Sequence, residues 1–190
     1  MKYMRIIVGI SGASGVIMGY RLLQALKQYE DIQTHLIISD NAMINFGLET
    51  DISVGEVKAL AHHCHDNTDM AACISSGSFI TDGMVIIPCS MKALSAVANG
   101  YTADLLARAA DVCLKEGRKV VLVPREMPLG RAHLRNMQLA AENGCHILPP
   151  MLTFYNGLTS TEDQIQHVIG KVLMLFGLEY ENFRPWRGGK

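Results

Sequence analysis

Residues 4–15 read MRIIVGISGASG, and this stretch decides how the rest of the chain is interpreted. Arg5 to Ile10 is a short apolar run rich in β-branched residues, and helical spacing of apolar residues begins soon after the turn that follows it. A buried strand, a turn of small residues and a helix in this order direct backbone N–H groups and a helix N-terminus at one point. The hydroxyls of Ser11 and Ser14 suit a monophosphate. We therefore interpret the turn as an anion site, with an ordinary tight turn as the alternative.

The composition excludes several classes of function. With 17 basic and 18 acidic residues and a net charge of −1, the chain offers no electrostatic basis for binding nucleic acid. No apolar run approaches the length of about 18 residues that a membrane span needs. The length of 190 residues favours a single domain over residues 1–190. Hydrophobic residues make up 49% of the chain, and this excess without a membrane span predicts a homo-oligomer.

The cysteines and the N-terminal residues both point to one compartment. Five cysteines are an odd number, and they form no C-x-x-C pair, which is typical of reduced thiols. The first residues, MKYMRIIVGISG, lack the apolar region and cleavage site of a signal peptide. We therefore expect a cytoplasmic protein without a membrane partner.

Apolar strands and helices alternate along the chain. The expected strands share continuous apolar runs that stop at turn residues, and they cover residues 5–10, 34–39, 84–87, 119–123 and 145–148. The expected helices between and after them cover residues 42–48, 54–63, 94–98, 103–115 and 134–141, with a last helix capped by Thr159 and Glu162. Residues 64–82 are interpreted as a functional loop. This alternation predicts a doubly wound parallel α/β sheet, a Rossmann-like three-layer sandwich.

Ligands of such sheets bind beyond the carboxyl ends of the strands, so the residues that follow each strand are candidates for a site. Ser90 follows the third strand and opens a helix, which again presents backbone N–H groups. Arg125 could offer its planar fork to a phosphate or a heterocycle carbonyl. Glu126 and Glu49 are two carboxylates available for proton transfer. A surface ion pair without a role is the alternative for Arg125 and Glu126.

Two further groups invite a chemical interpretation that we do not favour. Cys89 has no histidine near it in the sequence, so simple packing is the better interpretation than a nucleophile. Residues 62–65 read HHCH, but adjacent side chains on one helix or strand diverge and cannot all reach one ion. We interpret this segment as a solvated helix end and predict no metal site.

With these residues in view, the chain resembles the flavin prenyltransferases of the UbiX type, including those paired with phenolic-acid decarboxylases. The stretches that carry the resemblance run nearly from end to end: 12–15 (GASG), 49–51 (ETD), 74–79 (ISSGSF), 87–90 (IPCS), 108–112 (RAADV) with 115–116 (KE), 123–126 (VPRE) and 154–155 (FY). The resemblance implies a flavodoxin-like homo-oligomer, often a dodecamer, with FMN held between subunits. It also implies transfer of a dimethylallyl group from dimethylallyl monophosphate to reduced FMN without a metal. The product would serve a UbiD-type decarboxylase.

The resemblance also implies roles for particular residues. FMN contacts fall on Gly12, Ala13, Ser14, Ser39, Ser90, Met91, Lys92, Ala93 and Arg125. Catalytic roles fall on Ser14, Glu49, Arg108, Lys115 and Glu126, and binding of the prenyl phosphate falls on Tyr155 and Lys171. Lys171 stands where the family has an arginine, and a lysine keeps the charge but loses the bidentate fork. Residues 177–190 form an aromatic and basic tail that we interpret as a lid or an inter-subunit arm.

Two other functions remain open at this stage. One is an FMN-dependent decarboxylase that acts on an organic acid itself, which release of carbon dioxide by the protein alone would reveal. The other is a carrier that holds FMN for a partner without chemistry. A carrier would not need two carboxylates, Glu49 and Glu126, beside the flavin.

Overall fold

The computed structural model describes residues 3–155, 157, 159–186 and 188. The chain divides into two compact units, Met1–Pro149 and Pro150–Lys190, and each is described by itself. The interpretation of residues 1–190 as one domain, with 177–190 as a lid or arm, stays a prediction. Residues 187, 189 and 190 of that tail lie outside the described residues.

The N-terminal unit contains one parallel sheet, as predicted. All five predicted strands are present: β1 (Met4–Ile10), β2 (Ile32–Ile38), β4 (Gly83–Cys89), β5 (Lys119–Pro124) and β6 (Cys145–Ile147). Their spatial order is β2-β1-β4-β5-β6, and a further short strand, β3 (His63–His65), pairs with β2 at the edge. The five predicted strands therefore follow the flavodoxin order, while the edge strand completes the order of the dinucleotide-binding fold. In both orders the direction in which successive strands are added to the sheet reverses between β1 and β4.

The edge strand overturns one prediction. The helix expected over residues 54–63 is the five-residue α3 (Val54–Lys58), and residues 63–65 form a strand in place of a solvated helix end. The backbone N–H of His62 donates to Thr34 Oγ1 over 3.2 Å, and Thr34 N donates to His62 Nδ1 over 3.2 Å. Pairing with β2 thus decides the conformation of this segment, and local sequence pattern alone does not contain that information.

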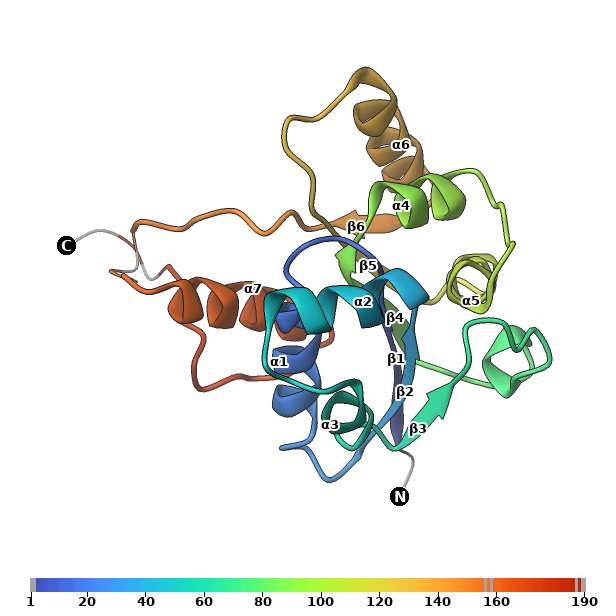
Figure 1. The fold of residues 1–190 in the computed structure, drawn as a ribbon, viewed down its shortest axis with the longest axis horizontal. Helices are drawn as coiled ribbons and strands as arrows, with labels where there is room; N and C mark the ends of the chain where they lie inside the picture. The colour runs from blue at the N-terminus through green and yellow to red at the C-terminus, as the bar shows by residue number, and fades with distance from the viewer. Residues whose placement is uncertain (1–2, 156, 158, 187, 189–190) are drawn as a thin grey trace. The chain divides into compact units, whose positions relative to one another are not determined.

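Helices cover both faces of the sheet, as Figure 1 shows for α1 and α5. On one face, α1 (Ile17–Leu26) contacts β1, β2 and β4. The close approach depends on Gly19, because a Cβ there would lie 2.7 Å from the carbonyl oxygen of Ile87. On the other face lie α4 (Met91–Ala98), α5 (Leu105–Lys115) and α6 (Arg131–Glu142), of which α4 and α5 contact β5. The remaining elements of this unit are α2 (Asp40–Glu49) and the short 3₁₀ helix η1 (Cys73–Ser75).

The C-terminal unit is built on α7 (Thr161–Leu175). Its N-terminal capping box is formed by Ser160 and Asp163, one residue later than the predicted pair of Thr159 and Glu162. The tail packs along this helix, because Gly170 has no side chain to keep Phe183 away: a Cβ at Gly170 would lie 2.4 Å from the Phe183 ring. Across the described residues, every helix is too short or too polar to cross a membrane.

Candidate functional site

The N-termini of three helices meet at a cavity beyond the carboxyl ends of β1, β2 and β4. The cavity encloses about 210 Å³. Its lining combines hydroxyls, amides, carboxylates and one lysine with small apolar residues: Ser11, Ser39, Asp40, Asn41, Asn67, Ser90, Lys92, Ala93, Ala96, Asp104, Leu106 and Ala107. The position of this cavity at the reversal of strand order is where the sequence analysis places a ligand.

Each of the three helices begins with a side-chain cap. Ser39 Oγ accepts from Ala42 N at the start of α2, Ser90 Oγ accepts from Ala93 N at the start of α4, and Asp104 Oδ1 accepts from Ala107 N at the start of α5. A cap satisfies one of the four free N–H groups of a first turn. At α5 the other three are also taken, by Asn67 and by the carbonyl of Asp104. The N–H groups at the start of α2 and α4, together with the positive dipole ends, are therefore the ones available to an anion. The predicted contacts Ser39, Ser90, Lys92 and Ala93 all line this cavity.

Ser11, which follows β1 and lines the cavity, is hydrogen-bonded to the end of β4. Its hydroxyl donates to the carbonyl of Pro88 over 2.9 Å and accepts from the backbone N–H of Ser90 over 2.8 Å. Ser11 is 3% exposed, so both hydrogen bonds are shielded from water and fix the relative position of the two turns. The resemblance assigns no role to this residue, and its place directly after the first strand is the signal in the sequence.

The first turn packs against α2. A Cβ at Gly12 would lie 2.4 Å from the Cβ of Asn41, so this position excludes a side chain. At the end of the turn, Gly15 adopts a φ of +94° and donates its N–H to Glu49 Oε2 over 2.7 Å. The structure therefore brings the predicted catalytic residue Glu49 to the turn that carries Ser14. Gly12, Ala13 and Ser14 adjoin the cavity through Ser11 but do not line it.

Three other predicted residues near the carboxyl edge do not line the cavity. Met91 is half-buried and packs against the core that includes α4 and α5. Arg125 follows β5, and its backbone N–H donates to the carbonyl of Cys89 over 3.1 Å while the residue is exposed. Glu126 is also exposed, and its Oε1 accepts from the N–H of Met127 over 3.0 Å. Arg125 and Glu126 make no ion pair with each other among the described residues.

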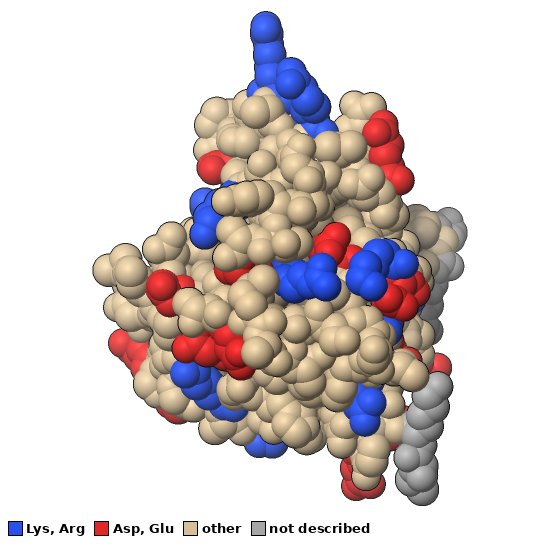
Figure 2. Space-filling view, turned by 90° about the vertical axis from the view of Figure 1, so that its right-hand side faces the viewer, with Lys and Arg blue, Asp and Glu red and all other residues tan. Residues whose placement is uncertain are grey.

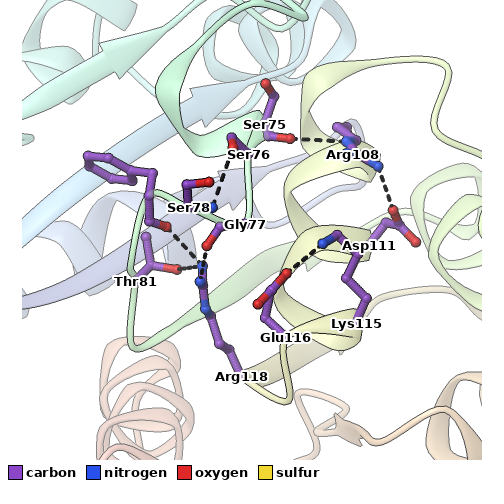
Figure 3. Close-up of polar contacts among 11 residues, drawn as sticks. Ser75, Ser76, Gly77, Ser78, Thr81, Arg108, Asp111, Lys115, Glu116 and Arg118 are labelled. Carbon is purple, nitrogen blue, oxygen red and sulfur yellow. Dashed lines mark hydrogen bonds and ion pairs between the residues drawn. The ribbon is translucent and has the colours of Figure 1, made fainter.

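Arg108 and Lys115 belong to a second polar group, in which α5 and Arg118 hold the loop of residues 75–81 (Figure 3). Arg108 Nε donates to the carbonyl of Ser75 over 3.1 Å, and its Nη1 lies 2.9 Å from Asp111 Oδ2. Lys115 Nζ lies 2.5 Å from Glu116 Oε1, and this hydrogen bond lowers the pKa of Glu116. Neither cation lines the cavity, so within one chain the predicted catalytic residues fall into separate groups.

The loop itself is held by Arg118, a residue that the sequence analysis does not single out. Its guanidinium donates to the carbonyls of Gly77 and Phe79 over 2.6 and 2.9 Å (Figure 3). A Cβ at Gly77 would meet the Glu116 carboxylate, so a side chain there would displace the end of Glu116. The serine-rich stretch is thus a fixed support for α5, and the arginine that fixes it lies more than thirty residues away in the sequence, where no local pattern reveals the pairing.

The two predicted substrate-binding residues belong to the C-terminal unit. Tyr155 is 54% exposed, and its ring packs edge-on against His167 and Trp186. Lys171 is half-buried on α7, and its charge contributes to lowering the pKa of His167 after the larger effect of burial. Tyr155 and the tail residue Trp186 therefore contact each other directly.

Two remaining observations bear on the chemistry. Cys89 is fully buried, and burial raises the pKa of its thiol, which agrees with a packing role. The face drawn in Figure 2 carries basic and acidic groups interspersed within a mostly uncharged surface. Among the described residues on this face, the basic groups form no continuous patch.

Comparison with known proteins gives the family. Residues 1–175 match the family model described as Flavoprotein. A curated relative from Sedimentibacter hydroxybenzoicus, named probable UbiX-like flavin prenyltransferase, is 59% identical over 187 residues, covering 98% of this chain and 99% of the relative. The solved structure described as a dodecameric FMN-dependent UbiX-like decarboxylase from Escherichia coli O157:H7 has a TM-score of 0.95 at 50% identity, covering 97% of this chain and 100% of that one. The structure of AnUbiX in complex with FMN and dimethylallyl pyrophosphate has a TM-score of 0.96 at 44% identity, covering 99% and 100%.

The parallel sheet, the cavity at its carboxyl edge and the match over residues 1–175 define the class as a flavoprotein. Within that class, the chain belongs to the UbiX-type flavin prenyltransferases. The resemblance drawn from the sequence motifs is therefore confirmed, together with the predicted fold class.

Proposed function

We propose that this chain transfers a dimethylallyl group from dimethylallyl monophosphate to reduced FMN and so makes a prenylated flavin. The observation that carries the proposal is the convergence of three capped helix N-termini and the hydroxyls of Ser11, Ser39 and Ser90 on one cavity. Such an array suits a phosphate monoester, through the N–H groups of α2 and α4 and the dipole ends of all three helices. AnUbiX, which shares 44% identity, is described in complex with FMN and dimethylallyl pyrophosphate.

The cavity fits part of FMN. Its donors suit the phosphate and the ribityl hydroxyls, and the small residues Ala93 and Ala96 leave room for the chain between them. A volume of about 210 Å³ is below the roughly 300–1,000 Å³ of pockets that enclose a whole cofactor. We propose that a second copy of this chain completes the pocket around the flavin ring. A dodecamer is the proposed assembly, and the relative from Escherichia coli O157:H7 is described as dodecameric.

The chemistry then divides between the cofactor and the protein. Reduced FMN, when bound, supplies the nucleophilic N5 and C6 atoms. The protein must stabilise the departing phosphate and move protons in a closed pocket. We assign the positive charge to Arg108, Lys115 and Lys171, and a hydroxyl donor to Tyr155. Because Arg108 and Lys115 do not line their own chain's cavity, we propose that they serve the pocket of a neighbouring copy.

Glu49 is the proposed proton carrier nearest the first turn, where its Oε2 accepts from Gly15 N over 2.7 Å. One carboxylate oxygen is engaged by this hydrogen bond, which leaves the other oxygen to exchange a proton with a bound molecule. Glu126, exposed after β5, is the second proposed carrier. Arg125 is assigned to the flavin, since its planar fork suits a phosphate or a ring carbonyl.

The product would leave for another protein. A prenylated flavin is a cofactor, so we propose a UbiD-type aromatic-acid decarboxylase as its recipient and the cytoplasm as the place of transfer. A second candidate function is decarboxylation by the chain itself, which the description of the Escherichia coli O157:H7 relative as a decarboxylase favours. Release of carbon dioxide from aromatic acids by the purified protein with FMN alone would support this second function.

Anaerobic incubation of the purified protein with reduced FMN and dimethylallyl monophosphate tests the proposal. We expect the extracted flavin to be heavier by one dimethylallyl unit and to have a changed absorbance spectrum. A parallel reaction with dimethylallyl diphosphate tests the choice of leaving group, and boiled protein is the control. Unmodified flavin with both donors would contradict the proposed function. A modified flavin with the diphosphate alone would contradict only the choice of donor.

A further inference from the structure

A group of histidines lies at the sheet edge formed by β2 and β3, apart from the residues that line the cavity. His35 from β2 and His65 from β3 are joined by a contact of 3.0 Å between His35 Nδ1 and His65 Nε2. Cys73, the first residue of η1, completes the group, because one potential ligand atom from each of the three residues lies within 4.8 Å of the others. We propose that His35, His65 and Cys73 form a binding site for a thiophilic divalent metal ion, with Zn²⁺ as the best fit.

The fold brings these three residues together from distant parts of the sequence. The register of β2 and β3 pairs His35 with His63 and Ile37 with His65, so the imidazoles of both strands lie on one face. The His35 ring stacks against both His63 and His65, with interplanar angles of 23° and 10°. The divergence of adjacent side chains does not prevent a shared ion here, because the proposed ligands come from three separate elements.

His35 is buried, and its hydrogen bonding is incomplete. The residue is 2% exposed, and its Nε2 has no hydrogen-bond partner among the described residues. Buried ring nitrogens are nearly always partnered, so the protein alone does not satisfy this imidazole. The contact with His65 uses Nδ1, which is the nitrogen that we assign to the ion.

The donor geometry is close to that of a tetrahedral site. Two imidazole nitrogens on one Zn²⁺ ion lie about 3.3 Å apart, as follows from Zn–N bonds of about 2.0–2.1 Å. The observed separation of 3.0 Å needs a small opening, and both rings must tilt so that their bonds converge on an ion beside the line that joins the two nitrogens. The Cys73 side chain is exposed and can rotate to close the third bond. A water molecule would occupy the fourth position.

The ligand set favours zinc among common ions. Neutral imidazole and thiolate are the donors that zinc prefers, whereas magnesium and calcium require oxygen. The thiolate offsets one charge of the ion, and the Asp69 carboxylate acts electrostatically on His65. The positive charge of the Arg5 guanidinium would repel the ion. This guanidinium lies over the Phe79 ring, 5.0 Å from its centroid, in a cation–π contact that partly offsets its charge.

The ion would tie η1 to the sheet edge. Ser75, the last residue of η1, accepts the hydrogen bond from Arg108 (Figure 3). Zinc at Cys73 would therefore hold the start of the loop that supports α5. The site takes no part in the proposed prenyl transfer, so its test does not depend on that function.

Metal titration of the full-length, chelator-treated protein tests the proposal. We expect one Zn²⁺ ion per chain, and we expect Co²⁺ in the same place to give a thiolate-to-cobalt charge-transfer band. Cys73→Ser should abolish this band. Both Cys73→Ser and His65→Gln should weaken zinc binding by about 10–100-fold or more, because loss of a residue that only supports a zinc ligand already has an effect of that size.

Cys64→Ser is the matched control, because Cys64 is also exposed but its thiol is directed to the carbonyl of Lys58 over 3.5 Å. This variant should keep wild-type zinc affinity and the cobalt band. Circular dichroism and FMN content confirm that each variant is folded. Failure of the wild-type protein to bind zinc stoichiometrically would overturn the proposal. Equal zinc affinities in all three variants would also overturn it, and a preference for copper at the same residues would overturn the choice of ion.

Discussion

The carboxylate of Glu49 accepts a hydrogen bond of 2.7 Å from the backbone N–H of Gly15, 34 residues earlier in the chain. Gly15 has a φ of +94°, a conformation that glycine adopts without strain. The contact closes the end of α2 onto the first turn. A carboxylate distant in sequence thereby becomes part of the turn that the sequence analysis interprets as an anion site.

Replacement of Glu49 by glutamine should separate its geometry from its ionisation. The glutamine carbonyl can still accept from Gly15 N, so Glu49→Gln should keep FMN and prenyl-donor binding while slowing one chemical step. A general acid or base typically contributes about 10²–10⁴-fold to a rate. Single-turnover kinetics under anaerobic conditions measure the effect, and Glu126→Gln is the companion variant. A wild-type rate for Glu49→Gln would exclude this residue from proton transfer.

Gly12 should tolerate no side chain. In Gly12→Ala the new Cβ would lie 2.4 Å from Asn41 Cβ, and such overpacking costs about 1–3 kcal/mol of unfolding free energy. We also expect weaker FMN retention, because the turn would move away from α2. Gly47→Ala is the control, since a Cβ at this helical position meets no atom within 4 Å. The control should gain up to about 1 kcal/mol. Urea denaturation measures the free energy of unfolding of both variants. Equal values for Gly12→Ala and Gly47→Ala would contradict the described packing of the first turn against α2.

Lys171 should bind the phosphate of the prenyl donor. Lys171→Ala should raise the donor concentration needed for half-maximal rate by about 10–100-fold, since a charged hydrogen bond is worth about 1.5–3 kcal/mol. Lys171→Arg should be tolerated or should improve binding, because it supplies a bidentate fork. Lys27→Ala, at the exposed end of α1, serves as the control for loss of a positive charge. Unchanged donor dependence in Lys171→Ala would remove this residue from the site.

The five thiols should differ sharply in reactivity. Cys64 and Cys73 are exposed, while Cys89, Cys113 and Cys145 are buried. Burial raises the pKa of Cys145 from 9.0 to about 11, so its thiolate fraction at pH 8 is small. Alkylation of the native protein followed by peptide mass analysis should modify Cys64 and Cys73 first. Modification of Cys145 at a comparable rate would contradict this order.

The same shift predicts a stability change at alkaline pH. The unfolded chain releases the Cys145 proton near pH 9, before the folded protein does, so unfolding becomes more favourable as the pH rises from 9 to about 11. The contribution of Cys145 is fully present below pH 9. A Cys145→Ala variant should show a flatter decline in melting temperature across this window. Parallel curves for the variant and the wild-type protein would contradict the assignment.

FMN binding should require assembly. If a neighbouring copy completes the pocket, the protein should sediment as an oligomer at micromolar concentration, and dissociated subunits should release the flavin. Ser14→Ala and Arg125→Ala should weaken flavin retention without unfolding the chain. A monomer that still holds FMN would rule out a shared pocket.

The sequence was sufficient for the main sheet because the four long strands, β1, β2, β4 and β5, and the short β6 all fall within apolar runs. The strand His63–His65 was not predictable, since a run of three residues carries no periodicity and its conformation depends on pairing with β2. The cap of α7 was predicted one residue too early. Thr159 with Glu162 and Ser160 with Asp163 fit the same spacing rule, and only the backbone geometry selects the second pair.

Prediction of the site was limited in the same way. Ser39 and Ser90 follow strands directly, and the structure places both at the cavity. Asp104 has a readable signal, because it precedes the apolar helix LLARAA at the capping position. Asn67 has none: its contacts with the N–H groups of Leu105 and Leu106 join segments almost forty residues apart. The separation of Arg108 and Lys115 from their own chain's cavity also follows from tertiary packing alone.

The two outermost strands of the sheet, β3 and β6, contain only three residues each. An edge that short presents few unpaired backbone groups, which disfavours prolongation of the sheet by a strand from another chain. Growth into fibres through backbone pairing is therefore disfavoured at both ends of the sheet. Side-chain surfaces are the better basis for assembly, and their shape can limit the number of copies and produce a closed particle of defined size.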